Sequence, residues 1–174
     1  MKTTLTVLLA AIAVNLSFVQ MANATAPEAG EKNLLPEEAI SKGLSLGMTV
    51  DELKEKRPAI QLNKEESFRK VYIEGDFSKS IDTVVCYLAT DDKGAERVYE
   101  FILVLREGLD PLAFGKGAAG EPNFTYKGNP EWRFSGEKTG LGGETALWTF
   151  KNKLIVAFAM PGSEWEEGFV EAAE

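Results

Sequence analysis

The chain has 174 residues and a formal net charge of −8, and it contains one cysteine and no histidine. The lack of histidine excludes Ser-His and Cys-His nucleophilic pairs, the imidazole ligands of most catalytic zinc sites and the commonest proton carrier near neutral pH. A single cysteine excludes a disulfide within the chain and thiolate metal clusters. A negatively charged chain without a basic run is also a poor candidate for binding nucleic acid.

The first 24 residues have the layout of a secretory signal peptide. Lys2 supplies a positive start, residues 5–14 are apolar apart from one threonine, and Ala22 and Ala24 form an A-x-A cleavage pattern. A membrane anchor is the alternative, but a spanning helix needs about 20 largely apolar residues, and polar residues interrupt this run earlier. No cysteine stands at the cleavage point to carry a lipid. We therefore expect cleavage after Ala24 and an unanchored mature protein in the periplasm or outside the cell.

The remaining residues divide into three parts by composition. Residues 25–35 are polar and predict a flexible lead-in, residues 36–162 have the length of one domain, and residues 163–174 form an acidic C-terminal tail. Cys86 lies in an apolar run that predicts a strand, and a free cysteine packs as a small hydrophobic residue. We expect this thiol to be buried.

A helix at residues 50–57 is specified at both ends. Thr49 and Glu52 form a capping box, in which each side chain bonds an otherwise unpaired backbone N–H. Pro58 cannot continue the helix. Only a narrow apolar stripe around Leu53 points inward, and the exposed positions are charged. Because the helix has no residue suited to catalysis, its expected role is to pack on a sheet.

The rest of the domain alternates between strand and helix signals. Another helix is expected to begin at Pro36, and a third to run from Asp110 to Gly120, where interior glycines cost helix stability and require packing against a partner element. Apolar residues elsewhere recur with a period of two. The expected strands are residues 68–77, 83–89, 97–107, 131–136, 145–150 and 154–160. This order predicts an α+β fold with short helices packed on one face of a mainly antiparallel sheet.

The stretch from Leu46 to Pro58, LGMTVDELKEKRP, resembles the G-M-T/S-x-x-[DE]-[LV] helix start of two families. These are the small lipoprotein of the outer-membrane β-barrel assembly machinery and the β-lactamase inhibitor proteins. The later segments AAGEPN, EWRF and ALWTFKNKLIVAF are similar to the remainder of the same pattern. The resemblance implies short helices on an antiparallel sheet and a function in binding other proteins without catalysis. The chain lacks the lipid-bearing cysteine of the lipoprotein, and the matching residues Gly47, Met48 and Thr49 have structural roles.

An aromatic cluster is the candidate binding site. Phe124, Tyr126, Trp132 and Phe134 lie within eleven residues, interleaved with proline, glycine and asparagine. Aromatic side chains on loops often anchor protein contacts, and they also line grooves for sugars or peptides. Phe124, Tyr126 and Trp132 are therefore the predicted contact residues, and Tyr126 is expected to be exposed. In the alternative arrangement Trp132 and Phe134 point into the core and Phe124 closes a helix end.

A carboxylate-based enzyme and a glycan-binding or other small-ligand protein stay open as alternatives. Such an enzyme pairs two acids, and the candidates are Glu100, Glu131, Glu144 and Glu164. Calcium would use the acids of residues 91–94 or 163–167, but the first segment has the composition of a turn and lacks the spacing of a calcium loop. The glycine-rich sequence GKGAAG lies within a helix, whereas phosphate loops precede one.

These features predict an exported, soluble, non-catalytic protein that binds another protein of the cell envelope or of the secreted fraction. We expect no cofactor, no metal and no nucleic acid. The sequence leaves the identity of the partner and the oligomeric state open.

Overall fold

The computed structural model describes residues 34–169. The predicted signal peptide and nearly all of the predicted lead-in lie outside these residues. Leu34 and Leu35 belong to the predicted lead-in, but their side chains are buried in the core. The prediction of a flexible segment is therefore wrong at these two positions, because their burial ties the chain to the domain before Pro36.

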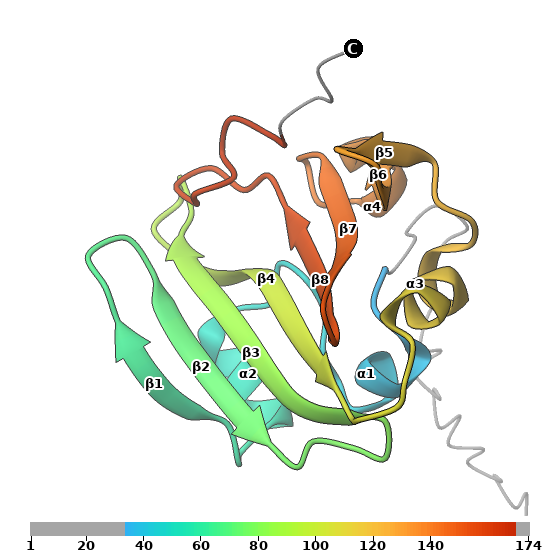
Figure 1. The fold of residues 1–174 in the computed structure, drawn as a ribbon. Helices are drawn as coiled ribbons and strands as arrows, with labels where there is room; N and C mark the ends of the chain where they lie inside the picture. Colours follow the sequence, from blue (N-terminus) through green and yellow to red (C-terminus); the bar gives the residue numbers. More distant parts are fainter. Residues whose placement is uncertain (1–33, 170–174) are drawn as a thin grey trace, which may run out of the picture.

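Within the described residues the chain forms eight strands and four short helices (Figure 1). The strands are β1 (Gln61–Glu65), β2 (Lys70–Gly75), β3 (Ile81–Thr90), β4 (Glu96–Leu105), β5 (Phe124–Tyr126), β6 (Asn129–Phe134), β7 (Thr145–Phe150) and β8 (Lys153–Phe158). The helices are α1 (Glu37–Ser41), α2 (Val50–Lys56), α3 (Pro111–Ala119) and α4 (Gly136–Thr139). The predicted α+β class is confirmed.

The eight strands form one antiparallel sheet with the order β1-β2-β3-β4-β8-β7-β6-β5. Each half of the chain supplies four strands that are neighbours both in sequence and in the sheet. The halves meet where β4 pairs with β8, along a ladder from Glu100 opposite Ala157 to Val104 opposite Lys153. We call this ladder the seam. Helices α1 and α2 precede the first half, α3 precedes the second, and α4 lies between β6 and β7 within the second half.

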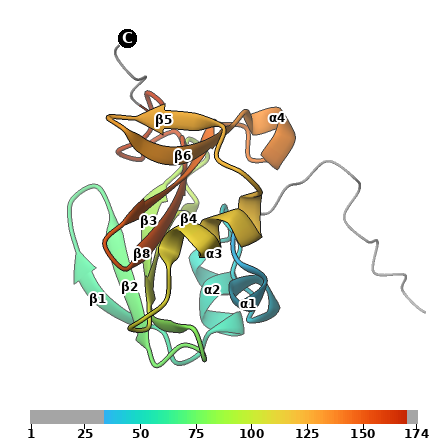
Figure 2. The same cartoon turned by 45° about the vertical axis from the view of Figure 1, so that its right-hand side comes forward.

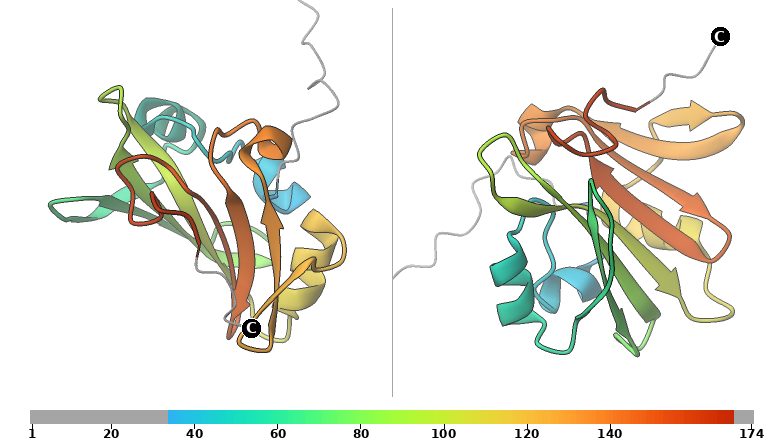
Figure 3. Two further views of the ribbon diagram at one scale, coloured as in Figure 1. Left: turned by 90° about the horizontal axis from the view of Figure 1, so that it is seen from above. Right: turned by 90° about the vertical axis from the view of Figure 1, so that its left-hand side faces the viewer.

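Helices α1, α2 and α3 lie on the same face of the sheet, as Figures 2 and 3 show. Helix α2 begins at the predicted capping box: Glu52 accepts a hydrogen bond from the Thr49 backbone N–H at 2.7 Å, and the Thr49 hydroxyl accepts one from the Glu52 N–H at 3.3 Å. Leu53 is fully buried. Helix α2 therefore packs on the sheet, as its sequence predicts.

A row of buried side chains crosses the sheet on the helix face. Its members pair across neighbouring strands and so share one face. The row consists of Tyr72, Cys86, Phe101, Val156, Leu147 and Trp132. The predicted burial of the Cys86 thiol is confirmed, and this burial raises the pKa of the thiol.

A glycine lets helix α3 approach strand β6 closely. The Trp132 ring lies against Gly115, where an added Cβ would stand 2.5 Å from the ring. The indole N–H of Trp132 donates to the Gly120 carbonyl at 2.8 Å, at the end of the same helix. Among the described residues, Trp132 is the largest of the fully buried side chains. The glycine-rich composition of α3 costs helix stability, but it makes room for this ring.

Three observed elements differ from the sequence-based prediction: β1, β5 and α4. Strand β1 is exposed along its whole length and is polar apart from Leu62, so it lacks the apolar alternation that marks a strand. Strand β5 has three residues and α4 has four, too few for a periodic signal. Strands β1 and β5 form because the edges of β2 and β6 provide partners for their backbone hydrogen bonds.

The contact between Gly115 and Trp132 predicts opposite outcomes at two glycines of α3. Gly115→Ala should lower the free energy of unfolding by about 1–3 kcal/mol, because the added methyl group displaces a buried ring. At Gly117 an added Cβ meets nothing within 4 Å. Gly117→Ala should therefore raise stability by up to about 1 kcal/mol through helix propensity. Urea unfolding followed by tryptophan fluorescence measures both variants, and two effects of the same sign would contradict this packing.

Candidate functional site

None of the described helices lies on the opposite face of the sheet, which we call the open face (Figure 2). A row of paired residues crosses it, one from each strand: Gln61, Ile73, Val85, Ile102, Ile155, Trp148, Glu131 and Phe124. In strands β2 to β4 and β6 to β8, each member stands one position from a member of the buried row. Because side chains alternate along a strand, the two rows lie on opposite faces.

The open face leaves apolar side chains in contact with solvent. Ile73, Val85, Ile102 and Val104 are half-buried, and Phe150 is 55% exposed. An antiparallel sheet with one face toward water normally alternates apolar with polar residues. Strands β3 and β4 are instead apolar on both faces. Exposed apolar areas often belong to interaction surfaces, so the open face is the candidate site.

Two hollows lie on the open face, one on each half of the sheet. The aromatic hollow, of about 360 Å³, is lined by Tyr126, Trp148, Phe150, Ile155, Trp165 and Phe169, with Glu131 and Arg133 among its polar groups. The aliphatic hollow, of about 310 Å³, is lined by Val71, Ile73, Val85, Tyr87, Ile102 and Val104, with Lys64, Glu66, Arg69 and Lys153 among its polar groups. Together the hollows extend the candidate site over both halves.

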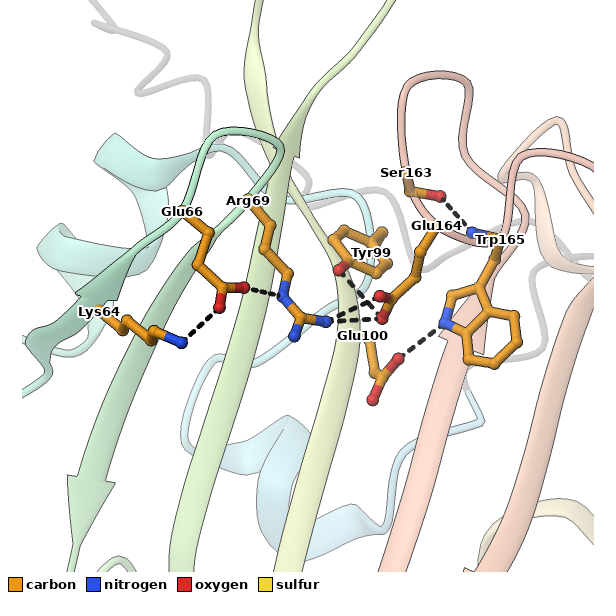
Figure 4. Close-up of polar contacts among 8 residues, drawn as sticks. All are labelled: Lys64, Glu66, Arg69, Tyr99, Glu100, Ser163, Glu164 and Trp165. Carbon is orange, nitrogen blue, oxygen red and sulfur yellow. Dashed lines mark hydrogen bonds and ion pairs between the residues drawn. The ribbon is translucent and has the colours of Figure 1, made fainter.

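Residues 161–169, which we call the C-terminal segment, contact the open face beside the seam (Figure 4). Trp165 donates its indole N–H to Glu100 Oε2 at 2.7 Å. Glu164 accepts from the Arg69 guanidinium at 2.8 Å. We predicted an acidic tail from residue 163 onward, and its described part packs on the sheet through these contacts.

Aromatic rings hold the C-terminal segment to strand β7. The Trp165 and Phe169 rings lie 5.8 and 6.1 Å from the Trp148 ring, both edge-on to it. The guanidinium of Arg133 lies 4.8 Å from the rings of both Phe124 and Phe169. Cations over aromatic faces are stabilising, so Arg133 ties the C-terminal segment to β5.

Glu100 is the carboxyl at the centre of this arrangement. It pairs in the sheet with Tyr87 on one side and with an alanine of β8 on the other, and it is only 6% exposed. Burial raises the pKa of the Glu100 carboxyl to about 7. The Trp165 N–H and the Arg69 charge oppose this rise, whereas the Glu164 carboxylate adds to it. Glu100 therefore takes up or releases a proton near neutral pH.

Arg69 is the cation of the site. Its Nε donates to Glu66 at 2.6 Å while another guanidinium nitrogen bonds Glu164. Its guanidinium also lies 4.6 Å from the Tyr87 ring. The Tyr99 hydroxyl stands 3.4 Å from Glu164, and burial raises the pKa of this tyrosine. Arg69 thus pairs with two carboxylates, and within residues 34–169 the Glu100 side chain has one hydrogen bond, from Trp165.

The structure separates the three residues that the sequence nominated for binding. Tyr126 is half-buried and lines the aromatic hollow. Phe124 is half-buried on the open face beneath Arg133, not at a helix end. Trp132 is fully buried on the helix face. A side chain in the core has no surface to offer a partner, so the alternative core position of Trp132 is the correct one.

The sequence does not single out Trp148, Trp165 or Phe169, and it offers Glu100 only as one of four candidate acids of a carboxylate-based enzyme. Trp148 lies in the strand predicted at residues 145–150, and the sequence does not show which face of the sheet it is on. Trp165 and Phe169 stand four residues apart in a segment read as an acidic tail. Two large aromatic residues in a short acidic stretch indicate that the stretch packs on the protein, because segments that stay solvated are poor in aromatic residues.

The described part of the chain contains no group of three or more acidic or cysteine side chains arranged to hold a metal ion. Within residues 34–169, no helix is long and apolar enough to cross a membrane. Compared with known proteins, the chain matches no family model, no curated protein and no solved structure. The resemblance suggested by residues 46–58 therefore stays a prediction, and function must be argued from the open face.

The raised pKa of Glu100 predicts a loss of stability as the pH rises. Between its ordinary value of 4.5 and about 7, the folded carboxyl keeps a proton that the unfolded chain has released. The free energy of unfolding falls across this window, by up to about 3 kcal/mol. The contribution of Glu100 is complete below pH 4.5 and is lost above about pH 7. Glu100→Gln, which stays neutral, should flatten the decline.

Urea unfolding of the wild type and the variant at pH 5, 6, 7 and 8 provides the measurement. Glu107→Gln is the matched control, since Glu107 is exposed and its replacement should leave the slope with pH unchanged. Parallel stability curves for the wild type and Glu100→Gln would show that Glu100 does not titrate in this range.

Proposed function

We propose that this is an exported, soluble, non-catalytic protein that binds another protein of the envelope or of the secreted fraction through the open face. The observation that carries the proposal is the row of apolar and aromatic side chains from β2 to β7, partly exposed except for the buried Ile155, which no described helix covers. Contact of such a surface with a partner removes apolar area from water, which is the main driving force of protein association.

The polar groups of the open face support binding over turnover. Glu131 is held by Arg133 at 2.8 Å, Glu164 by Arg69, and Glu100 by the Trp165 N–H. Each carboxylate already has a partner inside the protein. Charged groups that are paired around an apolar centre give an interface specificity and orientation. The lack of histidine in the whole chain points the same way.

A carboxylate-based enzyme is a second candidate function, and one observation favours it. A glutamate with a pKa of about 7 has the property of a general acid at neutral pH. Glu100 is nearly covered, however, so a substrate would reach it only if the C-terminal segment moved. Release of reducing sugar from cell-wall polysaccharide by the wild type, lost in Glu100→Gln, would favour the enzyme.

The binding proposal predicts that contact with a partner follows the face of the sheet. A benzophenone amino acid at Phe150, on the open face, should crosslink a discrete protein in cells that export the chain. The same group at Ile40, which is 38% exposed on α1, should not. Crosslinking of the same partner from both positions would contradict the assignment of the surface.

Affinity measured with the purified partner then gives a quantitative test. Ile102→Glu places a charge in the centre of the open face and should weaken binding at least tenfold, because the charge must give up its water when a partner covers this apolar surface. Ile40→Glu is the matched control and should leave the affinity unchanged. Circular dichroism must show that both variants are folded, and equal affinities would overturn the proposal.

A further inference from the structure

The C-terminal segment covers part of the open face without being part of the sheet. Its backbone N–H groups form local turns: Ser163 N–H donates to the Met160 carbonyl, Glu166 N–H to the Ser163 carbonyl, and Gly168 N–H to the Trp165 carbonyl. The segment forms no ladder with β4 or β8, and its contacts with them are made by side chains. A segment held in this way opens at a lower free energy than the strands beneath it.

The surface under the segment is shaped to receive a ring. Glu100 belongs to a second open-face row, in which its neighbours toward β7 are Ala157 and Ala146. Both alanines are fully buried although their row lies on the open face. Small side chains lower the sheet surface here, and Trp165 reaches down to bond the adjacent carboxyl. Beside the seam there is therefore a low area of the sheet surface, which we call the seat. The two alanines form its base, and the Glu100 carboxyl at its side is a hydrogen-bond acceptor.

Three contacts define what the seat accepts. Glu100 accepts a hydrogen bond from the N–H of a ring, Arg69 forms an ion pair with a carboxylate, and the Trp148 ring packs edge-on with another aromatic ring. The C-terminal segment meets all three with Glu164 and Trp165, which are neighbours in sequence. An acidic residue followed by tryptophan is therefore the chemistry to which this part of the open face is complementary.

We infer that the C-terminal segment occupies the partner's site from within the chain, and that the partner displaces it with a peptide segment of the same chemistry. The partner supplies a tryptophan whose N–H bonds Glu100 and a preceding carboxylate that pairs with Arg69. This inference rests on the proposed function and adds to it the kind of segment bound and the contact that regulates access. A tethered segment competes at an effective concentration on the order of millimolar, so only a partner that binds tightly opens the site.

A peptide supplied in trans tests the inference without the natural partner. The probe is the capped peptide of residues 161–169, PGSEWEEGF. The site is vacated in the full chain by Trp165→Ala with Phe169→Ala, and binding is measured by isothermal titration. The peptide should bind this variant at least tenfold more tightly than the wild type, whose seat is filled. The peptide PGSEAEEGF, which lacks the ring and its N–H, should bind at least tenfold more weakly than PGSEWEEGF.

The acceptor is tested by adding Glu100→Ala to the vacated variant, which should lower peptide affinity at least tenfold. Should the double alanine variant fail to fold, Glu164→Gln with Trp165→Phe removes the ion pair and the N–H donor but keeps the ring. No peptide binding to a folded, vacated variant would overturn the inference. Equal binding to that variant and to the wild type would overturn it too.

The partner found by crosslinking separates this inference from the proposed function. Glu164→Gln with Trp165→Phe weakens the internal competitor and should raise affinity for the partner at least threefold. A loss of affinity would show that the C-terminal segment is itself part of the interface, and the inference would fall while the proposed function stands. If no partner crosslinks at the open face although the peptide binds its seat, the proposed function fails instead.

Discussion

The pairing of β4 with β8 is the constraint on which the rest of the structure depends. It joins two four-stranded halves into one sheet, and neither half alone encloses the core. The buried row on the helix face runs without a break across this seam, from Phe101 of β4 to Val156 of β8. On the other face the seam carries Glu100. A single ladder of backbone hydrogen bonds therefore supports both the core and the candidate site.

Both faces of the sheet carry apolar side chains, but the two faces are covered to different extents. On one face, three short helices complete the core, and a glycine in α3 admits the ring of Trp132. On the other face, the C-terminal segment covers the part near Glu100 and contacts Trp148, and partly exposed side chains remain in both hollows. Covering this surface completely would increase stability, because apolar burial is favourable. A surface left apolar in spite of that gain is consistent with a partner that completes it.

The C-terminal segment connects the stability of the protein to its proposed function. Trp165 gives the buried Glu100 carboxyl a hydrogen bond, and an unpaired buried polar group is costly. Whatever displaces Trp165 must replace that bond or expose Glu100 to water. The same carboxyl that makes the segment's position specific thus makes the site selective for what replaces it. The pKa of about 7 adds a dependence on pH to this exchange.

The local sequence determined the elements whose signals are contained in a few neighbouring residues. The capping box of Thr49 and Glu52, the start of α3 at Asp110, the burial of Cys86 and the α+β class all follow from short-range hydrogen bonding and from hydrophobic period. Tertiary structure alone decided which face each strand presents to the helices. Because β3 and β4 carry apolar residues on both faces, their sequence does not distinguish the face that the helices cover from the open face. The two faces become different only when β4 pairs with β8 and the helices cover one side. The site followed that choice: Trp132 went to the core, whereas Glu100, Trp148 and Trp165 came together from distant positions, because their contacts depend on the register between strands and not on spacing along the chain.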